Sequence, residues 1–269
     1  MLEVIHEHNV LHIWLNRPER HNAFDDALIV QLGQALTEAS QTDGLRAVVL
    51  RGRGPSFSAG ADLGWMRRQA DASQEANLRD AQALAHLMRT LDSLSVPTIA
   101  AVQGSVFGGG VGLVACCDIA IASDDARFGL TEVRLGLLPA VISPYVVAAI
   151  GPRQARRWFT TGEHFDAHRA QAMGLVHECV PADLLQVAVD HQLELIVRAA
   201  PGATAQVGKL VREAAVITDP VQQDAANSAL IAALRAGPEG REGLDAFLSR
   251  RKPLWYPSPD NLPAGSPPP

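Results

Sequence analysis

The 269-residue sequence has few aromatic residues, no excess of basic residues and no long apolar run. Aromatic residues make up 5% of it, and 23 Lys and Arg residues stand against 29 Asp and Glu residues, which gives a net charge of −6. Because nucleic-acid binding needs a basic face, this balance argues against nucleic acid as a partner. Gly, Asp or Pro breaks each apolar stretch before it reaches the roughly 18 residues of a membrane span, so no membrane association is predicted.

Cysteine is also scarce, and its three positions do not form a metal-binding pattern. Cys116 and Cys117 are adjacent and the third cysteine is distant, which is not the spacing of zinc ligands. Histidines alternate between residues 6 and 12, but no carboxylate or cysteine cluster accompanies them. We therefore predict reduced, buried cysteines, no metal site and a cytoplasmic protein. The N-terminus agrees, since it lacks the basic start and apolar stretch of a signal peptide.

The rest of the composition, 47% hydrophobic and 19% charged residues, is that of a globular chain with a sizeable core. Periodicity predicts a hairpin over residues 2–15, strands at 47–51, 98–102 and 118–122, and helices at 25–42 and 74–94. Short strands that alternate with helices indicate an α/β sheet with crossover connections. From residue 143 the chain becomes mostly helical, with predicted helices at 143–150, 152–161, 166–173, 182–199, 202–216, 220–235 and 238–250, and one strand at 176–180.

Three stretches carry chemistry when they are taken together, although each alone also fits a plain structural role. Residues 57–62 (FSAGAD) form a small-residue turn into a helix, where N–H groups are free and a ligand can approach the backbone. Residues 104–112 (GSVFGGGVG) hold three successive glycines, but no Lys-Ser/Thr follows, which excludes a phosphate loop. Residues 128–139 (FGLTEVRLGLLP) place Glu132 among apolar residues, where burial would raise its pKa toward the range that proton transfer needs.

In this order and spacing the three stretches resemble the enoyl-CoA hydratase/isomerase (crotonase) superfamily, and the likeness runs over nearly the whole chain. Further matching phrases are NRPERHNAF (16–24), CDIAIAS (117–123), GLVHECVP (174–181) and GLDAFLSRRKP (243–253). The resemblance implies a ClpP/crotonase-like α/β spiral of ββα units that ends in a helical trimerisation region. The core with the oxyanion hole would span residues 1–200 and the oligomerisation region residues 201–255, in a homotrimer or homohexamer (dimer of trimers). The Pro-, Ser- and Gly-rich residues 256–269 are predicted to form a disordered tail.

The resemblance also assigns roles to single residues. In the family two backbone N–H groups bind the thioester oxygen, and here they would be those of Ala59 and Gly109, with Glu132 as the acid/base. Coenzyme A enters as part of the substrate, and no prosthetic group is implied. The residues implied to contact coenzyme A are Arg20, Ala23, Ala59, Gly60, Ala61, Asp62, Leu63, Phe247 and Arg250. The last two would reach a neighbouring subunit's cofactor. The residues implied to line the acyl pocket are Trp65, Gly112, Val141 and Tyr145.

The sequence departs from the hydratases of the family at one catalytic position. Those enzymes usually hold a water between two glutamates, of which Glu132 matches the second, whereas Gly112 stands at the first. Isomerases of the family use a single glutamate. For a hydratase, Tyr145 or the substrate itself could supply the missing contact to the water.

A further phrase narrows the expected substrate. Residues 137–146 (LLPAVISPYV), together with FGGGVGL, resemble the methylglutaconyl-CoA hydratase branch and its isohexenylglutaconyl relatives, which act in leucine and acyclic terpene breakdown. Such substrates carry their own carboxylate. We hypothesise that this carboxylate helps to orient water in place of the missing glutamate.

The expected activity is that of a lyase, which adds water reversibly to an α,β-unsaturated acyl-CoA. The alternative is a Δ3,Δ2-enoyl-CoA isomerase or another enolate reaction, such as decarboxylation or thioester hydrolysis. A third class is a non-catalytic homologue that binds acyl-CoA or RNA, and the acidic balance argues against RNA.

Overall fold

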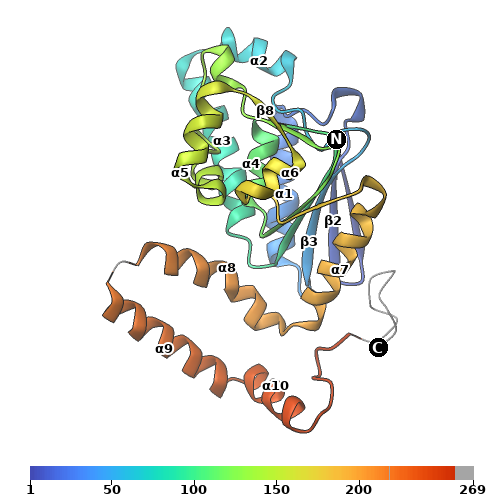
Figure 1. The fold of residues 1–269 in the computed structure, drawn as a ribbon, viewed down its shortest axis with the longest axis vertical. Helices are drawn as coiled ribbons and strands as arrows, with labels where there is room; N and C mark the ends of the chain where they lie inside the picture. Colours follow the sequence, from blue (N-terminus) through green and yellow to red (C-terminus); the bar gives the residue numbers. More distant parts are fainter. Residues whose placement is uncertain (218, 258–269) are drawn as a thin grey trace.

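The computed structural model describes residues 1–217 and 219–257, so most of the tail predicted at residues 256–269 lies outside the described residues. Its main sheet has six strands in the order β1-β2-β3-β4-β6-β9 (Figure 1). The strands are β1 (Leu2–Glu7), β2 (Val10–Leu15), β3 (Ala47–Gly52), β4 (Thr98–Val102), β6 (Ile119–Ser123) and β9 (Glu178–Val180). The hairpin predicted at residues 2–15 is confirmed as the antiparallel pair β1–β2, and the other pairs of this sheet are parallel.

The predicted helices are confirmed to within a few residues at their ends. They are α1 (Asp26–Gln41), α2 (Leu63–Ala70), α3 (Gln74–Asp92), α4 (Gly109–Cys116), α5 (Ser143–Thr161), α6 (Ala167–Met173), α7 (Leu185–Arg198), α8 (Pro201–Val216), α9 (Pro220–Ala236) and α10 (Pro238–Leu248). The two helices predicted at 143–150 and 152–161 form α5, which breaks at Gly151. Within residues 1–217 and 219–257, none of the helices combines the length and hydropathy that crossing a membrane requires.

Alternate residues of the central strands face two different hydrophobic layers. Val48 and Leu50 of β3 belong to the larger cluster, which also holds buried residues of α1, α3, α4 and α5. Val49 of β3 and Ile99 of β4 belong to a smaller cluster with residues of α7. Because both faces of the sheet are covered, β3 and β4 are buried along their whole length, and this explains their short apolar runs.

A second sheet of three short strands was not predicted from the sequence. It consists of β5 (Ser105–Phe107), β7 (Arg127–Gly129) and β8 (His164–Asp166), in the order β5-β7-β8. Each strand is three residues long, which is too short for a period of two to show in the sequence. This small sheet matters because β5 leads directly into the glycine cluster and β7 leads toward Glu132.

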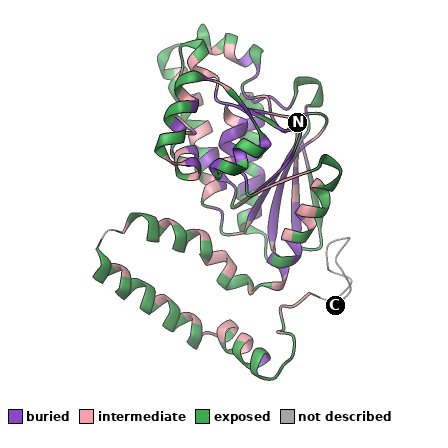
Figure 2. Cartoon of the chain, in the orientation of Figure 1, coloured by how far each residue is buried: buried purple, intermediate pink, exposed green. Residues whose placement is uncertain are grey.

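The last three helices form a C-terminal arm, residues 201–248, that projects from the rest of the chain (Figure 1). Figure 2 shows it as mostly exposed, and neither α8 nor α9 contains a buried residue. Large apolar side chains of both helices face solvent, among them Val211, which is 60% exposed, and Val221, which is 76% exposed. The arm therefore presents an apolar surface that the other described residues do not cover.

We predict that the turn between β4 and β5 tolerates no side chain at Gly104. Its φ is +59°, and an added Cβ atom would lie 1.8 Å from the carbonyl oxygen of Pro55. Gly44 has a similar φ of +74° but no atom within 4 Å of an added Cβ. Gly44→Ala should therefore cost about 1 kcal/mol from backbone strain alone. Gly104→Ala should cost about 3 kcal/mol or more, because it adds a steric clash. Equal shifts of the two urea-denaturation midpoints would contradict this.

Candidate active site

The chemical stretches of the sequence converge beyond the carboxyl ends of the parallel strands. β3 leads into residues 53–62, and β4 leads into residues 103–108. The two segments are joined there by a parallel bridge between Ser58 and Val106. Ligand sites of parallel α/β sheets lie at this edge of the sheet, so the convergence marks a candidate active site.

The first turn begins as an extended segment whose N–H groups are already used. The N–H of Ser58 donates to the Ser105 carbonyl at 3.1 Å, and the Ser58 carbonyl accepts from the N–H of Phe107 at 2.9 Å. The N–H of Ala59 points the other way and donates to the His21 carbonyl at 2.9 Å. This segment therefore lies between two neighbouring segments of the chain and offers no free donor.

The free donor of this turn lies two residues later than the sequence predicted. Gly60 has a φ of +86° and redirects the chain, and no described residue accepts a hydrogen bond from the N–H of Ala61. The prediction that Ala59 supplies the first oxyanion donor is thus corrected, because its N–H is occupied. Ala61 is the residue of this turn that can donate to a ligand.

The second turn supplies a donor at the start of α4. The N–H of Gly108 donates to the Gly129 carbonyl at 3.0 Å and fixes the turn to the small sheet. Gly109 is the first residue of α4, and the first turn of a helix leaves its N–H groups without partners inside the helix. Within the described part of the chain nothing accepts the N–H of Gly109, which agrees with the predicted role.

The two turns approach each other too closely for side chains. A Cβ atom added to Gly60 would lie 3.0 Å from the Phe107 carbonyl oxygen. One added to Gly110 would lie 2.8 Å from the Ser58 carbonyl oxygen. Glycine is required at both positions by this contact, which sets the two donors side by side.

The small sheet places Glu132 against the same two turns. Phe107 of β5 and Gly129 of β7 are opposite each other in parallel strands, so the residues that follow them leave the sheet side by side. Glu132 begins the 3-10 turn η2 (Glu132–Leu135). Its Oε1 would lie 3.0 Å from a Cβ atom on Gly108, so the carboxyl group adjoins the turn that holds Gly109.

The carboxyl group of Glu132 is poorly solvated and incompletely paired. Its Oε2 is buried, and no hydrogen-bond partner for it exists in the described residues. Burial raises the pKa of Glu132 above its ordinary value of 4.5, and a backbone N–H opposes this only in part. A carboxyl group with a raised pKa and a free oxygen is suited to proton transfer near neutral pH.

The space beside Gly112 is filled by an apolar side chain. A Cβ atom at this position would lie 2.3 Å from Cγ2 of Ile142 and 3.2 Å from Cε of Met88. Gly112 therefore does not line an open pocket, as the sequence predicted, but accommodates Ile142. Neighbouring Val141 is half-buried and packs on the same hydrophobic cluster.

Tyr145 lies toward the other end of α4 from the two donors. Burial raises the pKa of its hydroxyl, and so do Cys116, the last residue of α4, and Asp92, the last residue of α3. Gly109 starts α4, and the helix rises about 1.5 Å per residue, so Cys116 is about 10 Å from it. The charged and titratable groups that act on Tyr145 thus lie toward the end of α4 that is farther from Gly109.

Of the residues predicted to contact coenzyme A, some hold other parts of the site in place and others are exposed to solvent. Asp62 is buried, and its Oδ1 accepts from the N–H groups of Gly64 and Trp65 at the start of α2. Its Oδ2 accepts from Arg20 at 2.8 Å and from Arg17 at 3.4 Å. The hydrogen bond from Arg20 and those from the two backbone N–H groups hold the pKa of Asp62 below its ordinary value. Asp62 therefore holds α2 and Arg20 in place, and both of its oxygens are used within the chain.

The other predicted contacts are spread over the site and the arm. Ala23 is buried and its carbonyl accepts from Arg17, whereas Leu63 is 75% exposed beside the first turn. Trp65 is buried, and its indole N–H has no acceptor in the described structure. Phe247 lies in α10 and Arg250 follows that helix by two residues, and Figure 1 shows α10 far from α2, so these two residues do not join this chain's own site.

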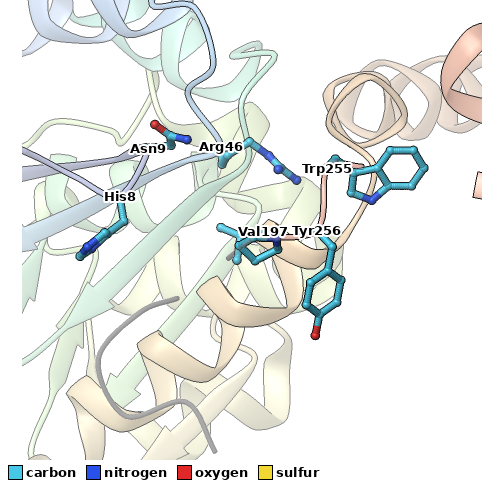
Figure 3. Close-up of a pocket in the computed structure, with 7 residues that line it drawn as sticks. His8, Asn9, Arg46, Val197, Trp255 and Tyr256 are labelled. Carbon is cyan, nitrogen blue, oxygen red and sulfur yellow. The ribbon is translucent and has the colours of Figure 1, made fainter. Parts of the chain in front are cut away.

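A separate hollow lies at the opposite edge of the sheet. It has a volume of about 240 Å³ and is lined by His8, Asn9, Arg46, Val197, Trp255, Tyr256 and Pro257 (Figure 3). Asn9 and Arg46 immediately precede β2 and β3, so this hollow adjoins the amino ends of the strands. The candidate active site lies at their carboxyl ends and is distinct from it.

The sequence missed one residue of the site, Ile142, and the role of another, since Ala61 was predicted to contact coenzyme A but not to supply the free N–H. The role of Ala61 could have been found from the behaviour of an extended segment. Its N–H groups point alternately to the two neighbouring segments and are hydrogen-bonded there. Gly60 ends the extended segment, so the N–H of Ala61, which follows it, is left free. Ile142 left no comparable signal, because its contact with Gly112 joins residues 30 positions apart in two different helical segments.

Comparisons with known proteins agree with this geometry. The profile of the family described as enoyl-CoA hydratase/isomerase matches residues 6–258. The structure of an enoyl-CoA hydratase from Shewanella pealeana superposes with a TM-score of 0.90 at 42% identity, over 94% of this chain and 95% of that one. The 2,3-dehydroadipyl-CoA hydratase of Escherichia coli is 33% identical over 94% of this chain and 97% of its own length. The mevalonyl-coenzyme A hydratase of Aspergillus fumigatus is 34% identical over 93% and 92%.

We predict an energetic coupling between Gly112 and Ile142. Gly112→Ala should destabilise the fold by about 1–3 kcal/mol, because its methyl group overlaps Ile142. In an Ile142→Ala background the same change should cost less, because the contact with Cγ2 is gone and Ala is about 1 kcal/mol better than Gly in a helix, although Cβ of residue 142 remains 2.9 Å away. Equilibrium denaturation of the two single variants and the double variant measures the coupling.

Gly33 of α1 provides the matched control, because an added Cβ there meets no atom within 4 Å. Gly33→Ala should stabilise the chain by about 0.5–1 kcal/mol. Strict additivity of the substitutions at 112 and 142 would contradict the coupling.

Proposed function

The chain belongs to the enoyl-CoA hydratase/isomerase family, and we propose that it adds water reversibly to the double bond of an α,β-unsaturated acyl-CoA. The observation that carries this proposal is the juxtaposition of one buried, incompletely paired carboxyl group with two turns that offer free N–H groups. The carboxyl group is that of Glu132, and the donors are Ala61 and Gly109.

The two N–H groups would stabilise the enolate that forms at the thioester. Attack of water at the β-carbon moves electron density onto the thioester oxygen, where it becomes negative charge. Fixed donors beside that oxygen lower the barrier, and loss of one such donor typically costs about 10²–10³ in rate. The donors are backbone groups in turns without room for side chains, so they are held in position before substrate binds.

Glu132 would move the proton in both halves of the reaction. Its carboxylate takes a proton from the attacking water as the oxygen bonds to the β-carbon, and the carboxylic acid then protonates the α-carbon as the enolate collapses. One group on one face of the substrate performs both transfers, which gives syn addition. Its raised pKa suits both roles, because the acid and the base forms are then close in free energy.

We further propose that the acyl group carries its own carboxylate, as in glutaconyl-type CoA esters. The space where a second catalytic glutamate would stand is occupied by Ile142, so residue 112 cannot supply the second contact to water. The relatives named for dehydroadipyl-CoA and mevalonyl-CoA act on acyl groups with polar substituents. The unpaired indole N–H of Trp65, four residues after Ala61, is a donor of the kind that would recognise such a substituent.

The second candidate is a Δ3,Δ2-enoyl-CoA isomerase, and the single glutamate favours it. Glu132 would then take a proton from the α-carbon and return it to the γ-carbon, with no water consumed. The same pair of N–H groups would hold the dienolate. Oxygen-18 incorporation from labelled water separates the two reactions, since only hydration leaves the label in the product.

We also propose that the chain assembles as a homotrimer or a dimer of trimers. The arm exposes Val207, Val211 and Val221 on α8 and α9, and a neighbouring copy would cover them. Phe247, which is 80% exposed, and Arg250 would then reach the coenzyme A bound by that neighbour.

Glu132→Gln should lower kcat for hydration by about 10²–10⁴, with little change in the affinity for the CoA ester. Gln keeps the size of the side chain but removes the proton transfer. The exposed Glu163, paired with Arg157 at 2.9 Å, provides the control, and Glu163→Gln should leave kcat unchanged. A Glu132→Gln enzyme within tenfold of the wild type would remove Glu132 from the mechanism.

Glu132→Gln should also change how the free energy of unfolding depends on pH. Because the folded pKa of Glu132 is raised, its ionisation opposes folding as the pH rises above the ordinary value of 4.5. Glu132→Gln should thus be more stable than the wild type at pH 7, and the difference should vanish below about pH 4.5. The wild-type rate should fall as the pH drops through this raised pKa.

A substrate panel tests the proposed acyl group. Crotonyl-CoA, a glutaconyl-type CoA ester and a 3-enoyl-CoA are each incubated in oxygen-18 water, and the products are analysed by mass spectrometry. We expect labelled hydration product, with kcat/KM at least about tenfold higher for the carboxylate-bearing ester, the value of one charge-assisted hydrogen bond. Equal efficiency on the first two esters would refute the carboxylate proposal, and unlabelled isomerisation of the third alone would favour the isomerase.

Trp65→Phe tests whether the indole N–H of this residue recognises the carboxylate-bearing ester. This change removes the N–H and keeps the ring, so the preference for the carboxylate-bearing ester should fall while turnover of crotonyl-CoA persists. Trp158 is the matched control, because it is also buried but its N–H contacts Sδ of Met173 at 2.7 Å. Trp158→Phe should leave the preference as it is in the wild type.

A further inference from the structure

Asn22 is a buried side chain near the site that makes three hydrogen bonds, and the proposed mechanism does not use it. It is fully buried and adopts a left-handed backbone conformation with a φ of +54°. Its Oδ1 accepts from the N–H of Arg17 at 2.8 Å, and its Nδ2 donates to the carbonyls of Arg53 at 2.9 Å and Ser56 at 2.7 Å. Its own carbonyl accepts from Oγ of Ser58 at 2.9 Å. The side-chain amide thereby joins the loop after β2 to the loop after β3, and the backbone carbonyl of the same residue joins it to the first turn.

The residues on either side of Asn22 form one wall of that turn. The carbonyl of His21 accepts the N–H of Ala59. Phe24 donates its N–H to the Gly60 carbonyl at 2.6 Å, and its carbonyl accepts the N–H of Asp62 at 2.7 Å. Residues 21–24 thus hold both peptides that flank Ala61, and they leave the N–H of Ala61 as the unpaired group.

The same segment also touches the second donor. A Cβ atom on Gly109 would lie 3.1 Å from Cε2 of the Phe24 ring. Phe24 is buried, so its ring is held between the core and the start of α4. Residues 21–24 therefore contact both turns that carry the free N–H groups, and Asn22 is their anchor to the rest of the loops.

We propose that Asn22 is a positioning residue that sets the directions of the Ala61 and Gly109 N–H groups through residues 21–24. It does not touch the substrate. The proposal rests on the proposed function, because it concerns the polarisation of a bound thioester. A substitution at Asn22 should therefore change how strongly the site polarises the thioester carbonyl more than it changes the affinity for the CoA ester.

The test uses Asn22→Asp and Asn22→Gly in the full-length protein. Asp has the same shape but turns an acceptor toward the Arg53 and Ser56 carbonyls, whereas Gly keeps the left-handed backbone and removes every side-chain bond. Asn9 provides matched controls, since it has a φ of +62° in an exposed turn. Asn9→Asp and Asn9→Gly control for charge and for the left-handed position.

The main readout is the absorption of a bound chromophoric thioester, cinnamoyl-CoA. Donors at the carbonyl oxygen draw electrons along the conjugated chain and shift its absorption to longer wavelength. We expect both Asn22 variants to lose at least half of the wild-type shift and 10- to 100-fold in kcat, with Kd within about threefold of wild type. The Asn9 variants should match the wild type in all three.

The pH dependence adds a readout that general destabilisation would not move. In Asn22→Asp the introduced carboxyl group faces two carbonyls, so its proton is retained to a higher pH, and the protonated form can donate to one of the two carbonyls that the amide bonds. Relative to the wild type, Asn22→Asp should therefore recover kcat and the spectral shift as the pH falls, and Asn22→Gly should not.

Each outcome decides the question. A wild-type spectral shift in the folded fraction of either variant would overturn the proposal, even if yield or thermal stability fell. If Asn22→Asp does not fold, Asn22→Gly carries the test by the same criterion. Absence of any shift in the wild-type protein would instead contradict the proposed function.

Discussion

The approach of two backbone turns within van der Waals distance is the constraint on which the site depends. Residues 58–61 and 107–110 meet at separations that leave no room for a Cβ atom on Gly60 or Gly110. Glycine loses more conformational entropy on folding than any other residue, so the fold bears a cost for this contact. In return, two main-chain N–H groups are held by strands and a helix end rather than by mobile side chains. Donors fixed before the reaction need not reorganise as charge develops on the thioester oxygen.

The same contact determines the environment of the acid/base. Gly108 brings the second turn against Glu132, which removes water from its carboxyl group and raises its pKa. The unpaired Oε2 shows that the fold leaves this group unsatisfied, although most buried polar atoms find partners. A raised pKa and an unpaired buried oxygen both reduce local stability, and perturbed groups of this kind cluster at functional sites. The packing of Ile142 against Gly112 leaves no space for a side chain at residue 112 that could assist this carboxylate.

The sequence allowed more of the fold to be predicted than of the site's detail. The long helices α1 and α3 and the buried strands β3 and β4 have clear periodicity, and their positions were predicted to within two residues. The strands β5, β7 and β8 escaped because three residues carry no detectable period, although their pairing brings Gly109 and Glu132 together. The motifs predicted a common site for Glu132 and Gly109, and the structure places Glu132 against the turn that holds Gly109. Ala59 was two residues away from the free donor, because motif likeness identifies a turn but not which of its N–H groups is already bonded.

In the proposed site, backbone groups bind the thioester oxygen and side chains bind the acyl group. This separation explains how proteins with one fold can act on different acyl groups. The proposed donors are main-chain groups, so substitution of nearby side chains should change them little as long as the glycine contacts persist. The acyl group would instead meet side chains such as that of Trp65, whose indole N–H has no acceptor in the described residues. This accounts for relatives at 33% and 34% identity that are named for dehydroadipyl-CoA and mevalonyl-CoA over nearly the same length of chain. In such a fold, substrate specificity can change through the side chains that surround the acyl group, while the backbone donors of the two turns are retained.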